Sequence, residues 1–185
     1  MGHLQPPHPP GAAPVSVILH TPRLTLDELE TDRDAGFILA LLNEPGFLEN
    51  IGDRGVRDLE GARRYIEEGP RASYAGYGYG LWRATERDGG RPVGLCGVLK
   101  RDGLKDPDLG YAFLASVWGR GFASEAARAC LDHARRALRL GRIVAITTPG
   151  NVASQAVLKK IGLKAAGVVR LPGKDEDSAY FVSEG

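Results

Sequence analysis

The sequence predicts one α/β (α+β) domain whose central sheet is mixed, mostly antiparallel, and covered by helices on both faces. Two observations lead to this prediction. Short apolar runs separated by turn residues such as Asp88-Gly89-Gly90 are typical of antiparallel strands. A long amphipathic segment over 123–140 stands between two further apolar runs, 109–114 and 143–148, which is the order of a βαβ unit with a parallel strand pair. The length of 185 residues fits a single domain.

The N-terminal half is expected to place one strand and two helices ahead of the antiparallel strands. Residues 16–29 alternate apolar and polar side chains and predict the first strand. Asp32 or Asp34 can cap a short helix that ends at Asn43-Glu44-Pro45-Gly46, and a second helix is expected over 58–68. The Gly-rich stretch between these helices, 47–56, shows neither the period of a helix nor that of a strand. The antiparallel strands are then expected over 79–85, 92–100 and 109–114.

The C-terminal half contains the clearest helix. Apolar side chains recur over 123–140 at the spacing of one helix face, and Gly141 is expected to end the helix. A strand over 143–148 follows, and then a helix over 151–161 with Asn151 as its N-cap and a Schellman-type end at Gly162-Leu163. The last two strands are expected over 163–171 and 178–182.

Composition and charge exclude several classes of protein. The chain has 24 basic and 23 acidic residues and a net charge of +1, which argues against a strongly basic nucleic-acid-binding protein. Its longest apolar run, 37–42, is far shorter than the ~20 residues of a membrane span. Two cysteines are too few for a disulfide framework or a four-cysteine zinc site, and the histidines follow no metal-ligand spacing.

A cytoplasmic protein without metal, membrane or nucleic-acid partners is therefore expected, and the sequence does not indicate its oligomeric state. Five prolines in the first 14 residues, with little apolar content, predict a disordered tail over 1–16. The folded domain is expected over 17–185.

One segment between a strand and the long helix indicates chemistry: Trp118-Gly119-Arg120-Gly121-Phe122-Ala123-Ser124-Glu125-Ala126. Its two glycines allow a sharp turn that leaves N–H groups unpaired at the helix N-terminus, where phosphate binds well. The segment does not match G-x-G-x-x-G, because position 124 is serine, and it is not a P-loop. Taken alone, this Gly-loop indicates either a phosphate site or an ordinary tight turn.

A second cluster follows the next strand, where Asn151-Val152-Ala153-Ser154 opens a helix and Ile161-Gly162-Leu163 closes it. Together the two clusters resemble the GNAT family of acetyl-CoA-dependent N-acetyltransferases, over roughly residues 21–163. With Thr21-Pro22-Arg23-Leu24 near the first strand, the chain is most similar to the branch that includes ribosomal-protein alanine N-acetyltransferases. Two positions depart from the family pattern. Trp118 replaces the usual Gln or Arg of the loop, and Leu158 stands where many members have the tyrosine that protonates the leaving thiolate.

The resemblance implies a GNAT-like fold in which the parallel strand pair is splayed around acetyl-CoA, a co-substrate. The end of the strand over 109–114 would pair with the pantetheine arm and offer a backbone N–H to the oxyanion. The Gly-loop would bind the pyrophosphate, and Asn151 would reach the arm or the acetyl end. The implied cofactor-binding residues are Phe113, Leu114, Ala115, Trp118, Gly119, Arg120, Gly121, Phe122, Ala123, Ser124 and Asn151.

For catalysis, the resemblance implies Ser154 as the proton donor to the thiolate and Asp108 as a base acting through water. Each has a plain structural alternative: Ser154 as part of a helix cap, and Asp108 as part of a surface turn. Cys96 has no histidine in a recognisable relation to it, so a covalent acyl-cysteine route is not expected.

The acceptor side is implied to lie between the first two helices, where Asp53 and Arg54 are the proposed substrate-binding residues. The tyrosines of the run 74–79 either adjoin this site or form one ordinary strand face. The resulting prediction is an N-acetyltransferase that moves acetyl from acetyl-CoA directly to a primary amine, of a protein N-terminus or a small molecule. The alternative is a non-catalytic acyl-CoA-binding module, because the tyrosine is missing.

Overall fold

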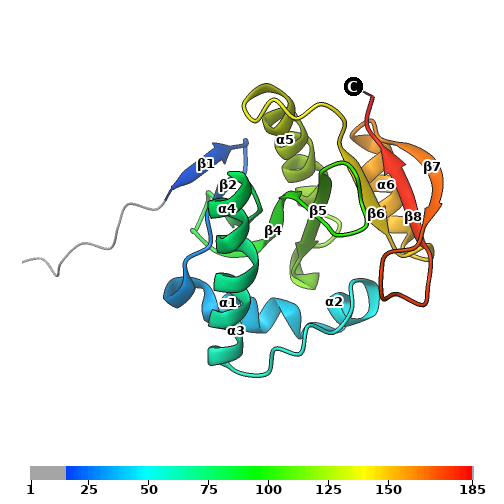
Figure 1. The fold of residues 1–185 in the computed structure, drawn as a ribbon. Coiled ribbons are helices and arrows are strands. Elements are labelled where there is room, and N and C mark those ends of the chain that lie inside the picture. Colours follow the sequence, from blue (N-terminus) through cyan, green and yellow to red (C-terminus); the bar gives the residue numbers. More distant parts are fainter. Residues whose placement is uncertain (1–15, 185) are drawn as a thin grey trace, which may run out of the picture.

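The computed structural model describes residues 16–184, which form an eight-stranded sheet flanked by helices (Figure 1). The strands lie in the order β1-β2-β3-β4-β5-β6-β8-β7, and every neighbouring pair is antiparallel except β5 and β6. Their bounds are Val17–His20 (β1), Leu24–Asp27 (β2), Leu81–Glu86 (β3), Pro92–Leu99 (β4), Asp108–Phe113 (β5), Val144–Thr147 (β6), Lys164–Val169 (β7) and Ser178–Val182 (β8). The predicted α+β class, with one parallel pair in a mostly antiparallel sheet, is confirmed.

Helices cover both faces of the sheet, as expected. Those before β3 are α1 (Thr31–Leu42), α2 (Pro45–Asn50), α3 (Leu59–Ile66) and α4 (Ala72–Tyr77), and those after β5 are α5 (Phe122–Arg136) and α6 (Val152–Lys160). A π-helical turn, Glu67–Arg71 (η1), joins α3 to α4, and a 3-10 turn, Ala115–Val117 (η2), follows β5.

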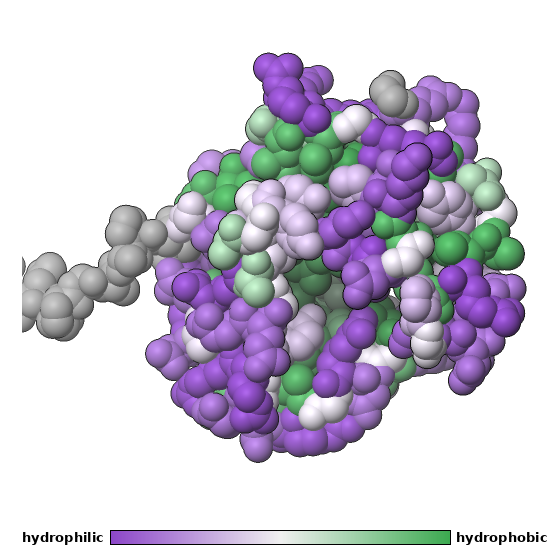
Figure 2. Space-filling model, viewed as in Figure 1, coloured by the Kyte–Doolittle hydropathy of each residue, from purple (hydrophilic) through white to green (hydrophobic). Residues whose placement is uncertain are grey.

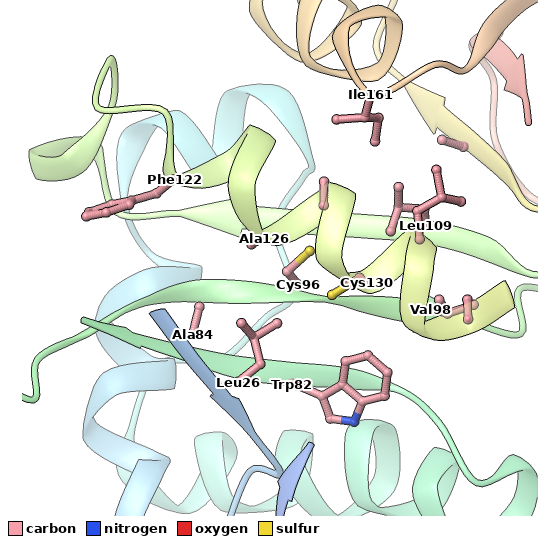
Figure 3. Packing of buried hydrophobic residues seen from close by; sticks show 14 of the residues in the cluster. Leu26, Trp82, Ala84, Cys96, Val98, Leu109, Phe122, Ala126, Cys130 and Ile161 are labelled. Atoms are coloured by element: carbon pink, nitrogen blue, oxygen red, sulfur yellow. The ribbon is translucent and has the colours of Figure 1, made fainter. Parts of the chain in front are cut away.

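The core lies in two layers because side chains alternate across β4. Leu95 packs with α1, α2 and α3 on one face, and Cys96 packs with α5 on the other. Figure 3 shows the second layer, in which Cys96 and Cys130 point toward one another beneath α5. Both thiols are buried, as expected for cysteines that serve as small apolar side chains.

The parallel pair is the feature that forms the site. β5 and β6 are paired at one register position, Asp108 with Val144, beside the 2.9 Å hydrogen bond from the Val144 N–H to the Pro107 carbonyl. Past this point β5 continues beside β4, while β6 pairs with β8. The rest of β5 therefore has one edge without a neighbouring strand.

Several predicted boundaries in the N-terminal half are wrong. The single strand over 16–29 is a hairpin of β1 and β2, because Pro22 interrupts it and Thr21 closes a turn by accepting from the Leu24 N–H at 2.9 Å. The Gly-rich stretch over 47–56, predicted to be irregular, contains most of α2, which starts at Pro45 and buries Phe47. A helix of six residues is too short to show a period.

The caps and the tyrosine run also differ from the predictions. The N-cap of α1 is Glu30, and Asp34 lies in the first turn, where it accepts from the Glu30 N–H at 2.8 Å. Residues 74–77 are helical, so the tyrosines do not share a strand face. Tyr74 accepts from the Leu29 N–H at 3.2 Å and is a packing residue.

In the C-terminal half, α5 ends at Arg136, four residues earlier than predicted. Arg139, with φ of 56°, supplies the left-handed position expected at Gly141. The prediction overran because Leu138 and Leu140 still pack on the core after the helix has ended. His133, on α5, is half-buried, and the centre of its ring lies 5.5 Å from that of Trp82. The Asn151 cap and the Gly162 end of α6 are confirmed.

Within the described part of the chain, none of the helices has the length and apolar character that crossing a membrane requires. No cluster of three metal-ligating side chains occurs among these residues either. The predicted tail falls almost entirely on residues 1–15, which lie outside the described residues.

Candidate functional site

A cleft follows the open edge of β5, and Figure 2 shows the hollow with apolar residues at its floor. It is bounded by α2 and the loop after it, by the Gly-loop before α5, by the start of α6 and by the loop between β7 and β8. The structure brings most of the predicted site residues to this cleft: Arg54, Asp108, Phe113, Trp118, Gly119, Gly121, Phe122, Ala123, Ser124, Asn151 and Ser154. Asp53, Leu114, Ala115 and Arg120 do not line it.

The backbone of β5 offers hydrogen-bonding groups to the cleft. In the register with β4, Gly110 and Ala112 belong to the alternate pairs whose peptide groups bond across to β4. The N–H and C=O groups of Tyr111 and Phe113 therefore face the opposite way, toward the gap. An extended chain of amides lying in the gap could pair with them as an added strand.

The two residues after β5 have already used their N–H groups. The Leu114 N–H donates to the Val93 carbonyl at 2.9 Å, and the Ala115 N–H donates to Oε2 of Glu44 at 2.8 Å. Of the three residues predicted to offer a backbone N–H to the oxyanion, only Phe113 has that group directed at the gap.

The Gly-loop has the conformation that its glycines permit. Gly119 and Gly121 have φ of 76° and 80°, and Gly121 is the N-cap of α5. No atom lies within 4 Å of the Cβ position of Gly119. The first N–H groups of α5 have no partner within the helix, so they and the helix dipole form an anion-binding position at the cleft.

Trp118 anchors the loop to its surroundings. Its Nε1–H donates to the Phe113 carbonyl at 2.8 Å, and its ring lies against α2 so closely that a Cβ on Gly46 would come within 2.3 Å of it. The sequence indicated Trp118 both as a departure from the family pattern and as an implied cofactor-binding residue, but not as an anchor between β5 and α2.

A charged network supports the loop from the side away from the cleft. Arg23 donates to Glu125 from Nε at 2.7 Å and to the Arg120 carbonyl from Nη1 at 2.8 Å. The guanidinium groups of Arg23 and Arg120 each lie 4.5 Å from the ring centre of Phe122. Sequence reasoning noted Thr21-Pro22-Arg23-Leu24 as a resemblance but assigned these residues no role.

Ser154 and Tyr111 meet across the gap. The Tyr111 hydroxyl lies 2.9 Å from Ser154 Oγ and 3.0 Å from the Ser154 carbonyl oxygen. Asn151 caps α6 by accepting from the Ser154 N–H at 3.1 Å. Burial raises the pKa of Tyr111 to about 12, although the hydrogen bond with Ser154 opposes the shift. Tyr111 was not among the predicted site residues.

Asp108 is buried, with 1% of its surface exposed, so the surface-turn alternative is wrong. Burial raises the pKa of its carboxyl, and the charge and hydrogen bond of Arg101, whose Nε lies 2.6 Å from Oδ2, oppose this shift. A backbone hydrogen bond from Ile146 on β6 also opposes the rise in pKa. A buried carboxyl with a raised pKa has the properties of a general base.

The two proposed substrate residues lie in different surroundings. Arg54 lines the cleft, whereas the carboxylate of Asp53 is bonded to Arg57 and to the Gly55 N–H. The hydrogen bonds from Arg57 and Gly55 lower the pKa of Asp53. Asp53 therefore shapes the loop that carries Arg54.

Comparison with known proteins identifies the family of this chain. The family model described as "Acetyltransferase (GNAT) domain" matches residues 23–164. The chain is 34% identical over 155 residues to the uncharacterized protein YkkB of Bacillus subtilis, a match that covers 82% of this chain and 88% of YkkB. The acetyltransferase of Agrobacterium tumefaciens has a similar structure, with a TM-score of 0.74, 25% identity, and coverage of 98% of this chain and 100% of that one.

Two further solved structures share the fold at lower identity. The ribosomal-protein-S5-alanine acetyltransferase of Vibrio fischeri has a TM-score of 0.73 at 17% identity, covering 90% of this chain and 95% of that one. The acetyltransferase AAC(6')-Ib, solved in complex with acetyl-CoA, has a TM-score of 0.71 at 20% identity, covering 87% of this chain and 93% of that one. The fold and the family match define an acetyltransferase enzyme. The chain belongs to the GNAT family.

Proposed function

We propose that this protein transfers an acetyl group from acetyl-CoA directly to a primary amine, with both substrates bound in the cleft along β5. The observation that carries the proposal is the open edge of β5, which ends beside the Gly-loop. The unpaired backbone groups of β5 and the anion-binding N-terminus of α5 are thus adjacent. The first suits the amides of a pantetheine arm, and the second suits the diphosphate at its end. The thioester supplies the activated acetyl group when it is bound.

Each residue then has a defined task. Phe113, the nearer of the two to the Gly-loop, pairs with the pantetheine amides through its backbone, and the Gly-loop N–H groups bind the pyrophosphate. The Tyr111 N–H, farther from the loop and beside Ser154, donates to the thioester oxygen as negative charge develops there. Asp108 accepts the amine proton through water, and Ser154 donates a proton to the departing sulfur.

The positions of the acid and the base agree with these tasks. Tyr111 packs with the core layer beneath α5 and α6, whereas Ala112, its neighbour in β5, packs with α1, α2 and α3. Asp108 has the same parity along β5 as Ala112 and so belongs to the opposite face from Tyr111 and Ser154. A proton can therefore leave the amine on one face of the sheet while the sulfur receives a proton on the other.

The amine is that of a protein N-terminus or of a small molecule. The first is suggested by the S5-alanine acetyltransferase of similar fold, and the second by AAC(6')-Ib, another structure of which is described as an aminoglycoside acetyltransferase. Arg54 and the loop between β7 and β8 lie at the cleft where either acceptor would enter.

The experiment is calorimetric titration with acetyl-CoA together with thiol release against a panel of amines: peptides with a free N-terminal alanine or serine, aminoglycosides and polyamines. Saturable binding with amine-dependent thiol release is expected. Binding without release for any acceptor would favour the non-catalytic acyl-CoA-binding module, in line with the buried Leu158 at the position of the family tyrosine.

A further inference from the structure

The contact between Tyr111 and Ser154 joins two elements that otherwise separate. Tyr111 belongs to β5 and Ser154 to the first turn of α6, on opposite sides of the gap. Asn151 already uses the Ser154 N–H for the helix cap, so the cap does not need the serine hydroxyl. Both residues line the cleft, and the hydroxyl contacts found among the described residues are those between Tyr111 and Ser154.

The contact involves two hydroxyl protons and three oxygens, namely the phenol oxygen, Ser154 Oγ and the Ser154 carbonyl oxygen. Two arrangements of hydrogen bonds use the short distance between the hydroxyls. In one, the phenol donates to the Ser154 carbonyl at 3.0 Å, and Ser154 Oγ donates to the phenol oxygen at 2.9 Å. In the other, the phenol donates to Oγ, and the serine proton is directed away from Tyr111. Only the second arrangement frees the serine proton for a group in the cleft. A hydroxyl that accepts a hydrogen bond is also a better donor, because the bonds polarise one another.

We propose that Tyr111 is a positioning residue that orients Ser154 Oγ–H toward the sulfur of the thioester and replaces the serine proton as it leaves. This inference rests on the proposed function. The step is a double proton transfer. The C–S bond breaks, and sulfur keeps the bonding pair and takes the Ser154 proton. Oγ takes the phenol proton at the same time, and the phenolate regains a proton from solvent. Asp108 takes the amine proton through water and releases it to solvent, so the protons balance.

The surroundings of Tyr111 suit this task. The raised pKa of its phenol keeps the proton in place throughout the neutral range. A buried Leu158 at the position of the family tyrosine explains why a hydroxyl from β5 takes part. Of the α6 side chains that line the cleft, only that of Ser154 carries a hydroxyl, and a serine alone has no proton to replace the one it gives.

The test compares Tyr111→Phe, Ser154→Ala and the double variant, using acetyl-CoA and whichever amine of the panel releases thiol fastest. Each single variant should lower kcat by ~10²-fold, within the range of general acid catalysis, while the dissociation constant of acetyl-CoA stays within about twofold. The double variant should lose no more than either single one, because the two residues act as a unit. Tyr180→Phe, on β8 outside the cleft, is the matched control and should keep full kcat.

A proton inventory in mixtures of water and heavy water separates the relay from a packing role. The wild type should give a curved plot of kcat against deuterium fraction, and Tyr111→Phe a linear one. Replacing Tyr111 by a difluorotyrosine keeps the hydroxyl and the fold but lowers the phenol pKa, so kcat should fall at a lower alkaline pH than in the wild type. Unchanged kcat and an unchanged inventory in Tyr111→Phe would overturn this inference alone. Absence of turnover in the wild type with every amine would overturn the proposed function, and the relay with it.

Discussion

Arg23 and Glu125 form an ion pair, Nε to Oε2 at 2.7 Å, that ties the turn between β1 and β2 to the first turn of α5. Glu125 also accepts from the Thr21 hydroxyl at 2.6 Å and the Arg23 N–H at 2.9 Å. Arg23 in turn donates to the carbonyl of Arg120 within the Gly-loop. The N-terminal hairpin therefore holds the loop in the conformation in which its N–H groups face the cleft.

Arg23→Ala should weaken acetyl-CoA binding although Arg23 does not line the cleft. Its removal leaves the Arg120 carbonyl without its side-chain partner and takes the guanidinium away from the Glu125 carboxylate, so the loop samples other conformations. We expect a loss of about three- to tenfold in affinity, corresponding to the ~1 kcal/mol of one hydrogen bond. Calorimetric titration measures it. Arg64→Ala, whose exposed ion pair with Glu60 on α3 lies outside the cleft, is the control, and an equal effect there would contradict the argument.

Glu125→Gln should show a loss of stability that depends on pH. Burial alone would raise the pKa of Glu125, but the hydrogen bonds from Thr21 and Arg23 outweigh it, and the pKa is lowered. A lowered pKa in the folded state contributes stability above the ordinary glutamate value of about 4.3 and loses it as pH falls through the lowered value. Urea unfolding at pH 7 should therefore show a deficit of roughly 1–2 kcal/mol that shrinks in acid. A deficit that does not change with pH would count against this account.

Gly121→Val should abolish acetyl-CoA binding while the far-ultraviolet circular dichroism stays close to that of the wild type. At φ of 80° a side chain is strained by about 1–2 kcal/mol, and the added Cβ stands 3.4 Å from Nη2 of Arg23. The loop must change its backbone, and the N–H groups then no longer converge on one anion. Gly121→Ala should be intermediate.

Gly36→Ala is the matched control for this pair, because Gly36 lies in α1 with no atom within 4 Å of its Cβ position. It should bind acetyl-CoA as the wild type does and be slightly more stable. A well-folded valine variant at position 121 that binds acetyl-CoA normally would remove the pyrophosphate from this loop.

The Gly-loop and the Asn151 cap were predictable because both are local. The positive φ at Gly121 and the N-cap at Asn151, three residues before Ser154, each depend on only a few adjacent residues. The role of Tyr111 was not predictable, since its partner Ser154 lies 43 residues away in the sequence. Their contact also depends on how far β5 and β6 diverge. Arg23 was missed for the same reason: a carbonyl 97 residues away gives it a role, and a single exposed arginine carries no such information in sequence.

Asp108→Asn should remove the acidic limb of the pH profile of kcat/KM. The carboxyl acts as a base only when it is ionised, and burial raises its pKa, so activity of the wild type should fall at a higher pH than an ordinary aspartate would cause. Arg101→Met removes the opposing charge and should move the limb to still higher pH. The measurement is kcat/KM between pH 5 and 9 at constant ionic strength. An acidic limb that persists unchanged in Asp108→Asn would assign the base elsewhere.

Trp118 should report acetyl-CoA binding by fluorescence. The chain has two tryptophans, and they differ sharply: Trp82 is 1% exposed in the core, whereas Trp118 is 55% exposed at the cleft. A ligand on the Gly-loop covers the Trp118 ring and leaves Trp82 untouched, so titration with acetyl-CoA should shift the emission of Trp118 alone. Trp118→Phe should abolish the change, and it should also weaken binding several-fold, because the Phe113 carbonyl loses its donor at the end of β5. Gly46→Ala offers a second test of the assignment to Trp118. The added Cβ would displace the indole, so the fluorescence emission should change before any ligand is added. If acetyl-CoA binds by calorimetry and the emission of Trp118 does not move, the ligand does not lie against this loop.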